Sequence, residues 1–294
     1  MRVTNKMMFD VASSQIGGAR DRTVKAQQEV TTGMRVVHPG DDPAAAGLMV
    51  SYQASIDRFT AIDQSTSRAS EEVQVADGSL QDVSTLLQRA NVLAVQLGND
   101  TNSASERAAG AQEVQDIFGQ LVRVMNTQVA GRYIFGGNVD QSPPFDAAGN
   151  YAGDANVRQV ETAPGLLQAA SVRADQALKG VGGGVDVFAA LTSLTTALST
   201  NDGTGIRSAI GNVGQSINQI ASALSQTGGM LSSFDSAKNV GSVAKDSATK
   251  VLASVSESDI FDATSRLTLA QQALEATLAV SARSFNTSLL DFLK

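Results

Sequence analysis

The sequence predicts a mainly α-helical protein, an elongated antiparallel bundle or coiled coil of helices with a small β-containing insertion. Three observations predict it: a 3–4 apolar repeat through residues 45–97, similar repeats later in the chain, and a Pro- and Gly-rich stretch between them. Hydrophobic residues make up 42% of the chain, but aromatic residues only 4%, and Trp is absent. This composition favours long helices joined by small side chains.

The longest repeat begins at Ala45 and ends at Leu97. Steps of alternately three and four residues reach sixteen positions, of which fourteen are apolar or aromatic and only Ser55 and Thr66 are polar. A repeat of this length predicts one continuous helix, roughly 80 Å long, with a narrow apolar face that packs along another helix. Such a rod is more typical of a structural element than of a catalytic scaffold.

A loop that ends in a helix start is predicted at residues 33–47. Asp42 fits the N-cap, Pro43 fits the first helical position, and Asp41 adds negative charge near the helix N-terminus. His38, the only histidine, lies close to both aspartates, but this spacing matches no common metal-ligand set. We therefore interpret the loop as a helix cap and expect neither a metal site nor a cofactor.

The next helix is predicted to begin after Ser103 and to end near Gly131. Ser103 and Glu106 match the S-x-x-E capping box, and the apolar repeat continues behind them. A short turn at Gly98 separates this helix from the long one, so the two are expected to form an antiparallel hairpin.

Helical periodicity is lost after the segment GRYIFGGN at residues 131–138. Residues 136–184 contain several Pro and Gly turns, and short runs at 157–162 and 166–172 are interpreted as strands. The Gly-rich run at 180–184 is interpreted as a linker, because no Lys-Ser or Lys-Thr follows it as a phosphate-binding loop would require.

Helical periodicity returns at Val187 and is predicted to continue in two further stretches. The first of these covers residues 206–224 and is expected to end at the Gly228-Gly229 pair, a usual place for a C-cap. The second runs from residue 230 to the C-terminus with no proline.

The predicted domains are two terminal segments, a helical core and the insertion. The terminal segments are 1–45 with 260–294, the core is 46–135 with 186–259, and the β-containing insertion is 136–185. Residues 1–32 have few apolar anchors, so this helix is expected to become ordered only against a partner helix. The expected assembly interface contains Val3, Met7, Val11, Ile260, Leu267, Leu274, Leu278, Phe285, Leu289, Leu290 and Phe292.

Charge and composition argue against several classes of function. The formal net charge is −7 and the 22 basic residues are scattered, which disfavours a nucleic-acid-binding protein. No stretch approaches eighteen consecutive apolar residues, so no membrane insertion is expected. Asp10 interrupts the apolar residues at the N-terminus, so a cleaved Sec signal is not expected either.

Catalysis is also disfavoured, although an enzyme carried on a helical stalk is the alternative from another class. The chain has one His, no Cys and no convergent set of carboxylates, which leaves few groups for a nucleophile or a base. Glu71 and Glu72 lie off the apolar face of the long helix and are interpreted as part of a solvated face. The sequence therefore predicts a protein that is not an enzyme.

The ends of the chain resemble those of the flagellin-like axial proteins of the bacterial flagellum. The resemblance rests on TTGMRVVHPGDDPAAAG at 31–47, on SFNTSLLDFL at 284–293, and on the symmetric order of terminal helices, core helices and insertion. Arg35 in that loop, the GRYIFGGN boundary, Pro143-Pro144-Phe145 and Asp186-Val187-Phe188 favour the members found at the hook–filament junction. Gly40 stands where relatives often have Ser, and the insertion is short.

The resemblance implies an elongated structural subunit that is exported through the flagellar type III apparatus and located in the extracellular flagellum. It implies that copies of the chain assemble with one another, between the first junction protein (FlgK) and flagellin. It further implies that the terminal segments pair as a coiled coil, and that a FlgN-type export chaperone holds the C-terminal helix. The alternative within the same family is a flagellin, the subunit of the filament itself.

Overall fold

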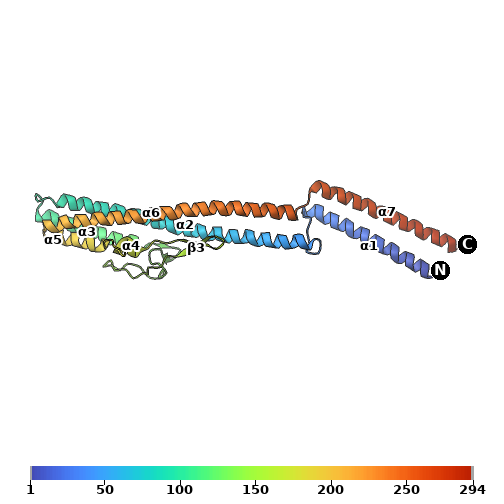
Figure 1. Cartoon of the computed structure of the whole chain (residues 1–294), viewed down its shortest axis with the longest axis horizontal. Coiled ribbons are helices and arrows are strands. Elements are labelled where there is room, and N and C mark those ends of the chain that lie inside the picture. The colour runs from blue at the N-terminus through green and yellow to red at the C-terminus, as the bar shows by residue number, and fades with distance from the viewer. Residues whose placement is uncertain (1, 293–294) are drawn as a thin grey trace. The chain divides into compact units, whose positions relative to one another are not determined.

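The computed structural model describes the backbone of residues 2–292 and the side chains of residues 6–283 (Figure 1). Its helices are α1 (Arg2–Thr32), α2 (Pro43–Leu97), α3 (Ala104–Met125), α4 (Ala174–Lys179), α5 (Val187–Ser199), α6 (Gly203–Ser256) and α7 (Ile260–Phe292). Its strands are β1 (Gln128–Val129), β2 (Arg132–Tyr133), β3 (Gln159–Ala163) and β4 (Leu166–Ala169). The mainly α prediction, with a small β-containing insertion, is confirmed.

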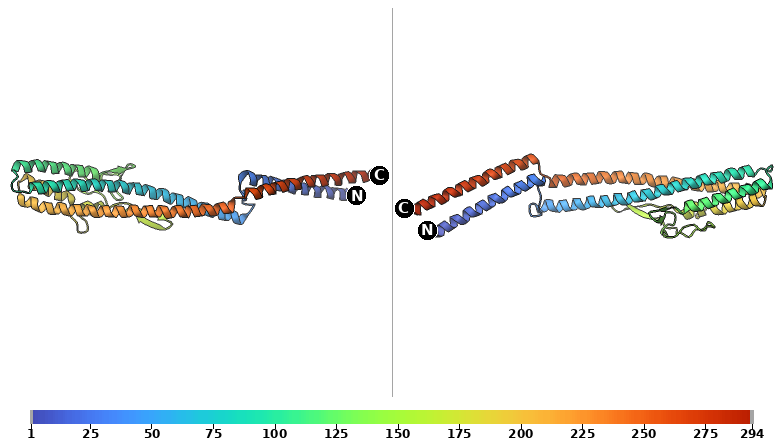
Figure 2. Two further views of the ribbon diagram at one scale, coloured as in Figure 1. Left: turned by 90° about the horizontal axis from the view of Figure 1, so that it is seen from above. Right: turned by 180° about the vertical axis from the view of Figure 1, so that it is seen from behind.

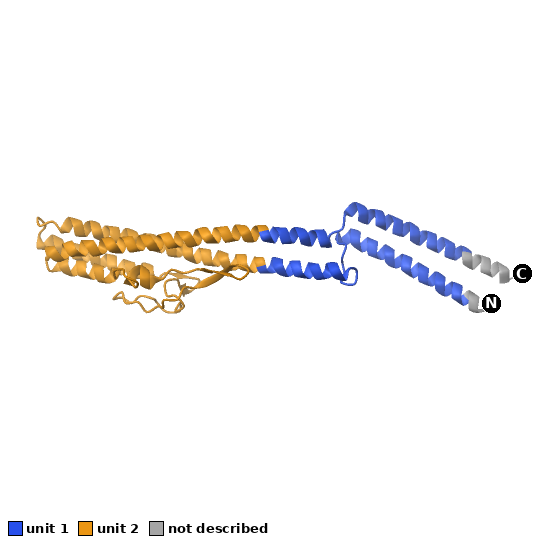
Figure 3. Ribbon diagram, viewed as in Figure 1, with its two compact units in different colours: residues 1–58, 244–294 blue, residues 59–243 orange. Residues whose placement is uncertain are grey.

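The chain folds into two compact units (Figure 3). Residues 1–58 and 244–294 form the first, and residues 59–243 form the second. The terminal helices α1 and α7 belong to the first unit, and the insertion belongs to the second. Both long helices, α2 and α6, run without a break through the residues at which the units divide.

The prediction of one continuous helix over residues 45–97 is confirmed by α2, which has 55 residues. From Ile62 to Leu97 its 3–4 positions are all buried, and Leu80, Leu87 and Ala94 are fully so. Thr66 interrupts the apolar series but is also buried, and its hydroxyl has no hydrogen-bond partner among the described residues. The spacing of the positions, more than their chemical type, therefore decides which face of α2 is covered.

The core of the second unit lies where α2, α3, α5 and α6 pack together. Its largest members include Leu121, Leu191 and Phe188, all of which are buried. The Phe188 ring lies 5.2 Å from the Phe118 ring and 5.2 Å from the Phe145 ring, centroid to centroid. Phe145 comes from the insertion, so these ring contacts fix the insertion to the helices of its own unit.

The capping box before α3 is confirmed, with Ser103 as the N-cap and Glu106 bonded back to it. The same turn contains a buried arginine that the sequence did not indicate. The Arg107 guanidinium donates hydrogen bonds to the carbonyl of Leu97 at 3.0 Å, the carbonyl of Asn99 at 3.1 Å and Oδ1 of Asn201 at 2.7 Å. Arg107 thus joins the α2–α3 turn to the α5–α6 turn.

The predicted end of the second helix near Gly131 is wrong, because α3 ends at Met125. A two-stranded hairpin, β1–β2, follows, and its turn residues Ala130 and Gly131 have φ values of 51° and 78°. A helix cannot pass through consecutive left-handed residues, so the chain turns there. Strands of two residues are too short to show a sequence period.

The two predicted strands of the insertion are present as β3 and β4, which pair antiparallel around a turn at Pro164-Gly165. A short helix, α4, follows them and was not predicted. The interpretation of Glu72 as a solvated residue is wrong. Its carboxylate lies 2.7 Å from Arg132 on β2 and 2.8 Å from Arg158 in the insertion, so it bonds α2 to both.

The predicted helix end at Gly228-Gly229 is also wrong, because α6 continues from Gly203 to Ser256. Neither glycine adopts a positive φ. A glycine inside a helix costs about 1 kcal/mol relative to alanine. Packing on both sides offsets this cost: Thr227 and Phe234 are fully buried, and the Thr227 hydroxyl donates a hydrogen bond to the Asp77 carboxylate on α2.

Candidate assembly surface at the chain termini

Helices α1 and α7 lie side by side and run antiparallel, with both chain ends at the same end of the pair (Figure 2). The side chains between them are buried or half-buried and recur every three or four residues. The Thr23 hydroxyl crosses between the helices and donates to the Ala270 carbonyl at 3.2 Å. These positions, here called the α1–α7 seam, are Ala12, Ile16, Ala19, Thr23 and Ala26 on α1, and Ala263, Leu267, Ala270, Leu274, Thr277 and Ser281 on α7.

The α1–α7 seam is built mostly from small side chains, and this leaves a groove. A cavity of about 490 Å³ lies between the helices, with Ala19, Ala26 and Ala270 among the residues that line it. Charged side chains also line it, including Glu29, which is 7% exposed and 3.5 Å from Arg266. Because burial of each methylene contributes roughly 0.8 kcal/mol, an alanine-rich seam contributes much less than a leucine-rich one.

The predicted interface residues fall into three groups. Leu267 and Leu274 lie in the α1–α7 seam and are half-buried there. Four others lie outside the seam and are exposed: Met7 by 66%, Val11 by 50%, Ile260 by 47% and Leu278 by 46%. The side chains of Val3, Phe285, Leu289, Leu290 and Phe292 lie outside the described residues.

More apolar surface is exposed on these two helices than the sequence analysis indicated. Met8, Val24, Phe261 and Leu269 are also exposed, and Phe261 is exposed by 81%. Exposed apolar side chains gathered on a small unit are typical of a surface that contacts another protein. The α1–α7 pair therefore has an internal seam that is weak and outer faces that remain apolar.

Two short segments lie at one end of the pair: residues 33–42 link α1 to α2, and residues 257–259 link α6 to α7. Together they are here called the connector. The two segments are hydrogen-bonded through their backbones. The Arg35 N–H donates to the Ser256 carbonyl at 2.8 Å, and the Ser258 N–H donates to the Gly33 carbonyl at 2.9 Å. Gly33 has φ 68°, a conformation that glycine adopts without strain, and it ends α1 at this point.

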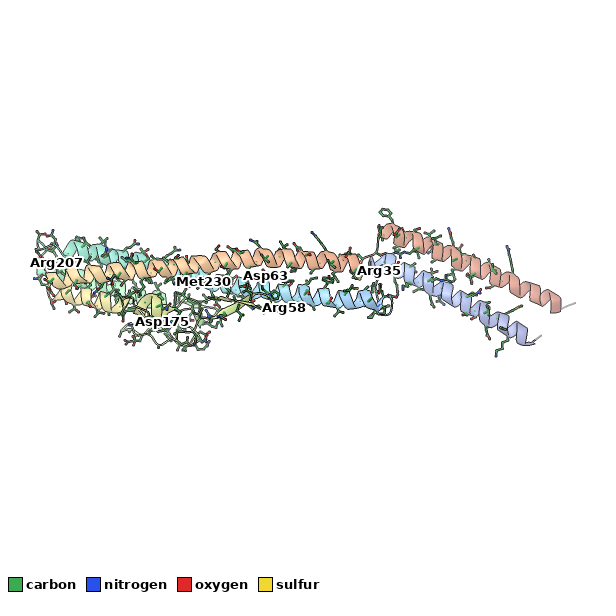
Figure 4. The ribbon with its side chains drawn as sticks, viewed as in Figure 1. Arg35, Arg58, Asp63, Asp175, Arg207 and Met230 are labelled. Atoms are coloured by element: carbon green, nitrogen blue, oxygen red, sulfur yellow. The ribbon has the colours of Figure 1, made fainter. Side chains whose placement is uncertain are left out.

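Arg35 and Asp42 fasten the connector at the start of α2 (Figure 4 labels Arg35). Asp42 Oδ1 accepts a hydrogen bond from the Ala45 N–H at 3.0 Å, the geometry of an N-cap, with Pro43 as the first helical residue. Asp42 Oδ2 lies 3.1 Å from the Arg35 guanidinium, which also donates to the Val255 carbonyl at 3.1 Å. The Ala45 N–H first, and then Arg35, lower the pKa of the Asp42 carboxyl.

Asp41 fastens the same loop to α1. Its carboxylate lies 2.8 Å from the Lys25 ammonium and accepts hydrogen bonds from the backbone N–H groups of His38 and Val37. The hydrogen bond from Lys25, followed by that from the His38 N–H, lowers the pKa of Asp41 to about 2. His38 therefore contacts Asp41 through its backbone.

In the part of the chain that the structure describes, no three His, Cys, Asp or Glu side chains are grouped as a metal ion would require. Nor does any helix there have the length and hydropathy needed to cross a membrane.

The N-terminal part of the chain matches a known protein family. Residues 3–140, from α1 through the β1–β2 hairpin, match the family model for the bacterial flagellin N-terminal helical region. Flagellar hook-associated protein 3 of Salmonella typhimurium is 33% identical over 162 residues, which are 54% of this chain and 51% of that protein. The Escherichia coli protein of the same name is 31% identical over 157 residues, 53% of this chain and 50% of that one. The chain thus spans about half the length of these relatives.

Solved structures share the fold. Bacillus cereus FlgL aligns with a TM-score of 0.59 at 23% identity, over 69% of this chain and 99% of that one. Flagellar hook-associated protein 3 of Legionella pneumophila aligns with a TM-score of 0.62 at 14% identity, over 69% and 98%. A flagellin, that of Clostridium tyrobutyricum, is 31% identical over 130 residues but is covered over only 34% of its length.

Proposed function

We propose that this chain is a flagellin-like protein and serves as a structural, non-enzymatic subunit of the hook–filament junction of the bacterial flagellum. One observation carries the proposal: the α1–α7 pair combines a small-residue seam with exposed apolar outer faces. Such a pair gains stability when further helices cover it. A subunit with this design becomes rigid at its ends upon assembly.

The partners follow from this role. Copies of the chain contact one another, a FlgK-type protein lies on the hook side, and flagellin lies on the other side. The chain reaches this extracellular position through the flagellar type III export apparatus, and a FlgN-type chaperone covers its C-terminal helix beforehand. The similarity to two proteins named flagellar hook-associated protein 3 supports the junction over the filament.

A deletion of residues 261–294 tests the role of the terminal pair. We expect the shortened protein to retain the helices of the second unit by circular dichroism, and to fail to restore filament attachment in cells that lack the intact gene. Normal filaments on such cells would contradict the proposal. Cells without the gene are expected to release flagellin monomers, whereas loss of the filament subunit itself would leave none to release.

A pair of point variants separates surface contact from folding. Leu278 is exposed on α7 and Val243 is exposed by 70% on α6, so each tolerates Asp in the monomer. We expect Leu278→Asp to reduce filament attachment strongly and Val243→Asp to leave it nearly unchanged. Equal effects of both variants would show that the terminal pair has no special part in assembly.

A further inference from the structure

A polar cleft of about 540 Å³ lies in the second unit, between α2 and the insertion. Ser65, Arg68, Ala69 and Glu72 line one side of it, at the i, i+3, i+4 and i+7 positions of a single helical face. Arg132, Asn138, Arg158 and Gln159 are among the residues that line the other side. None of these residues belongs to the terminal surface described above.

The cleft contains more cationic donors than carboxylate acceptors. Its lining includes three arginines and one carboxylate, that of Glu72. Glu72 is already occupied by Arg132 and Arg158, and Arg132 also lies 3.5 Å from Asp140. Nε of Arg158 is buried and has no acceptor among the described residues. In a chain with net charge −7, this concentration of guanidinium groups is unusual.

Arg68 is the arginine of the cleft that is open to a ligand. It is exposed, and its side chain makes no ion pair or hydrogen bond among the described residues. Arg132 is also accessible, with 45% of its side chain exposed. The amide groups of Asn138 and Gln159 add neutral donors beside them. Two accessible guanidinium groups that face one cleft suit an anion with several oxygen acceptors.

We propose that this cleft binds an oxyanion, a carboxylate or phosphate group, with Arg68 and Arg132 as its principal ligands. The anion has two sources, a small dissolved ion or an acidic side chain of a second copy of the chain. Binding a dissolved ion is independent of the flagellar role, whereas the second source rests on the proposed function. Glu72 positions Arg132 through the ion pair between them, and Arg158 binds the same Glu72 carboxylate.

Titration of the full-length chain with inorganic phosphate, and separately with acetate, tests the dissolved ion. Calorimetry at constant ionic strength is expected to show one site, and Arg68→Gln is expected to weaken binding about tenfold. Arg20→Gln is the matched control, since Arg20 is an exposed arginine on α1 and lies outside the cleft. Equal weakening by both variants would mean nonspecific attraction and would overturn the proposal.

A genetic experiment tests the second copy. Arg68→Glu is expected to reduce filament attachment, and reversal of one Asp or Glu elsewhere in the same protein to a basic residue is expected to restore it. Phosphate binding with normal attachment of Arg68→Glu identifies the dissolved ion, whereas restored attachment without phosphate binding identifies the second copy. Absence of both binding and an attachment defect, in a variant that is folded by circular dichroism, overturns the proposal.

Discussion

The α1–α7 pair and the α2–α3–α5–α6 core use the same helical spacing with different side chains. In the core, many of the spaced positions carry large side chains that are fully buried, such as Leu87, Leu121 and Leu191. In the pair they are mostly Ala, Thr and Ser, while larger residues such as Met7 and Phe261 are exposed. Spacing therefore determines where helices meet, whereas side-chain volume determines whether the contact is stable without a partner.

Truncation of a large side chain in the core is expected to cause the largest loss of stability. Leu87 is fully buried in it, so Leu87→Ala removes apolar contacts and leaves a cavity. We expect a loss of about 3 kcal/mol in the free energy of unfolding of the second unit, measured by urea denaturation and circular dichroism. If Leu87→Ala cost no more stability than truncation of a seam residue in the α1–α7 pair, the difference drawn between core and pair would be wrong.

Removal of the buried arginine should have the next largest effect. Arg107→Leu leaves the carbonyls of Leu97 and Asn99 without their donor. We expect a loss of about 2 kcal/mol and faster hydrogen exchange in both turns that Arg107 joins. Arg123 lies on the same helix and its side chain has no ion pair among the described residues, so Arg123→Leu serves as the control and should change little.

Truncation within the α1–α7 seam should cost less. Leu274 is half-buried there, so Leu274→Ala is expected to cost about 1 kcal/mol. Hydrogen exchange of residues 12–26 on α1 measures this effect locally. Leu278→Ala, in the same helix but exposed, should leave exchange in the isolated chain unchanged. Protection lost equally in both variants would show that the seam has been assigned to the wrong face.

Acidification should affect the connector and hardly affect the core. The pKa values of Asp41 and Asp42 are lower in the folded chain than in an unfolded one, so folding favours their ionised forms. The two carboxylates therefore contribute fully to the stability of the folded connector above about pH 4, and this contribution is lost as the pH falls toward 2. We expect cleavage by pepsin at residues 33–42 to increase over this range. In Asp41→Asn, the cleavage should be faster at pH 4 and should change less on acidification.

The sequence alone predicted those parts of the fold that follow from a regular repeat. The apolar period located α2 and α5, and local capping chemistry located Ser103. The errors arose where contacts between distant segments outweighed local preference. Gly228-Gly229 resembles a helix end, but burial of Phe234 and Thr227 on either side keeps α6 continuous.

The candidate assembly surface could be predicted only in part from the sequence, for a related reason. Met7 and Val11 are large apolar residues that the sequence makes conspicuous, but both are exposed and lie outside the seam. The seam itself, with Ala19 and Ala26, shows the 3–4 spacing only if alanine and threonine are counted with the large apolar residues. The Glu72 ion pairs and the cleft beside them depend on residues sixty or more positions away, which no local pattern reveals.

The connector has a consequence for the order in which the chain folds. Arg35 donates to the Val255 carbonyl across 220 positions, and the two backbone bonds beside it join equally distant segments. Contacts between such distant segments carry the largest entropic cost of closure, so they form late. On the proposed export route, a chain threaded from its N-terminus therefore emerges with α1 and the loop at 33–42 lacking their partner. This part of the molecule closes only when almost the whole polypeptide has arrived.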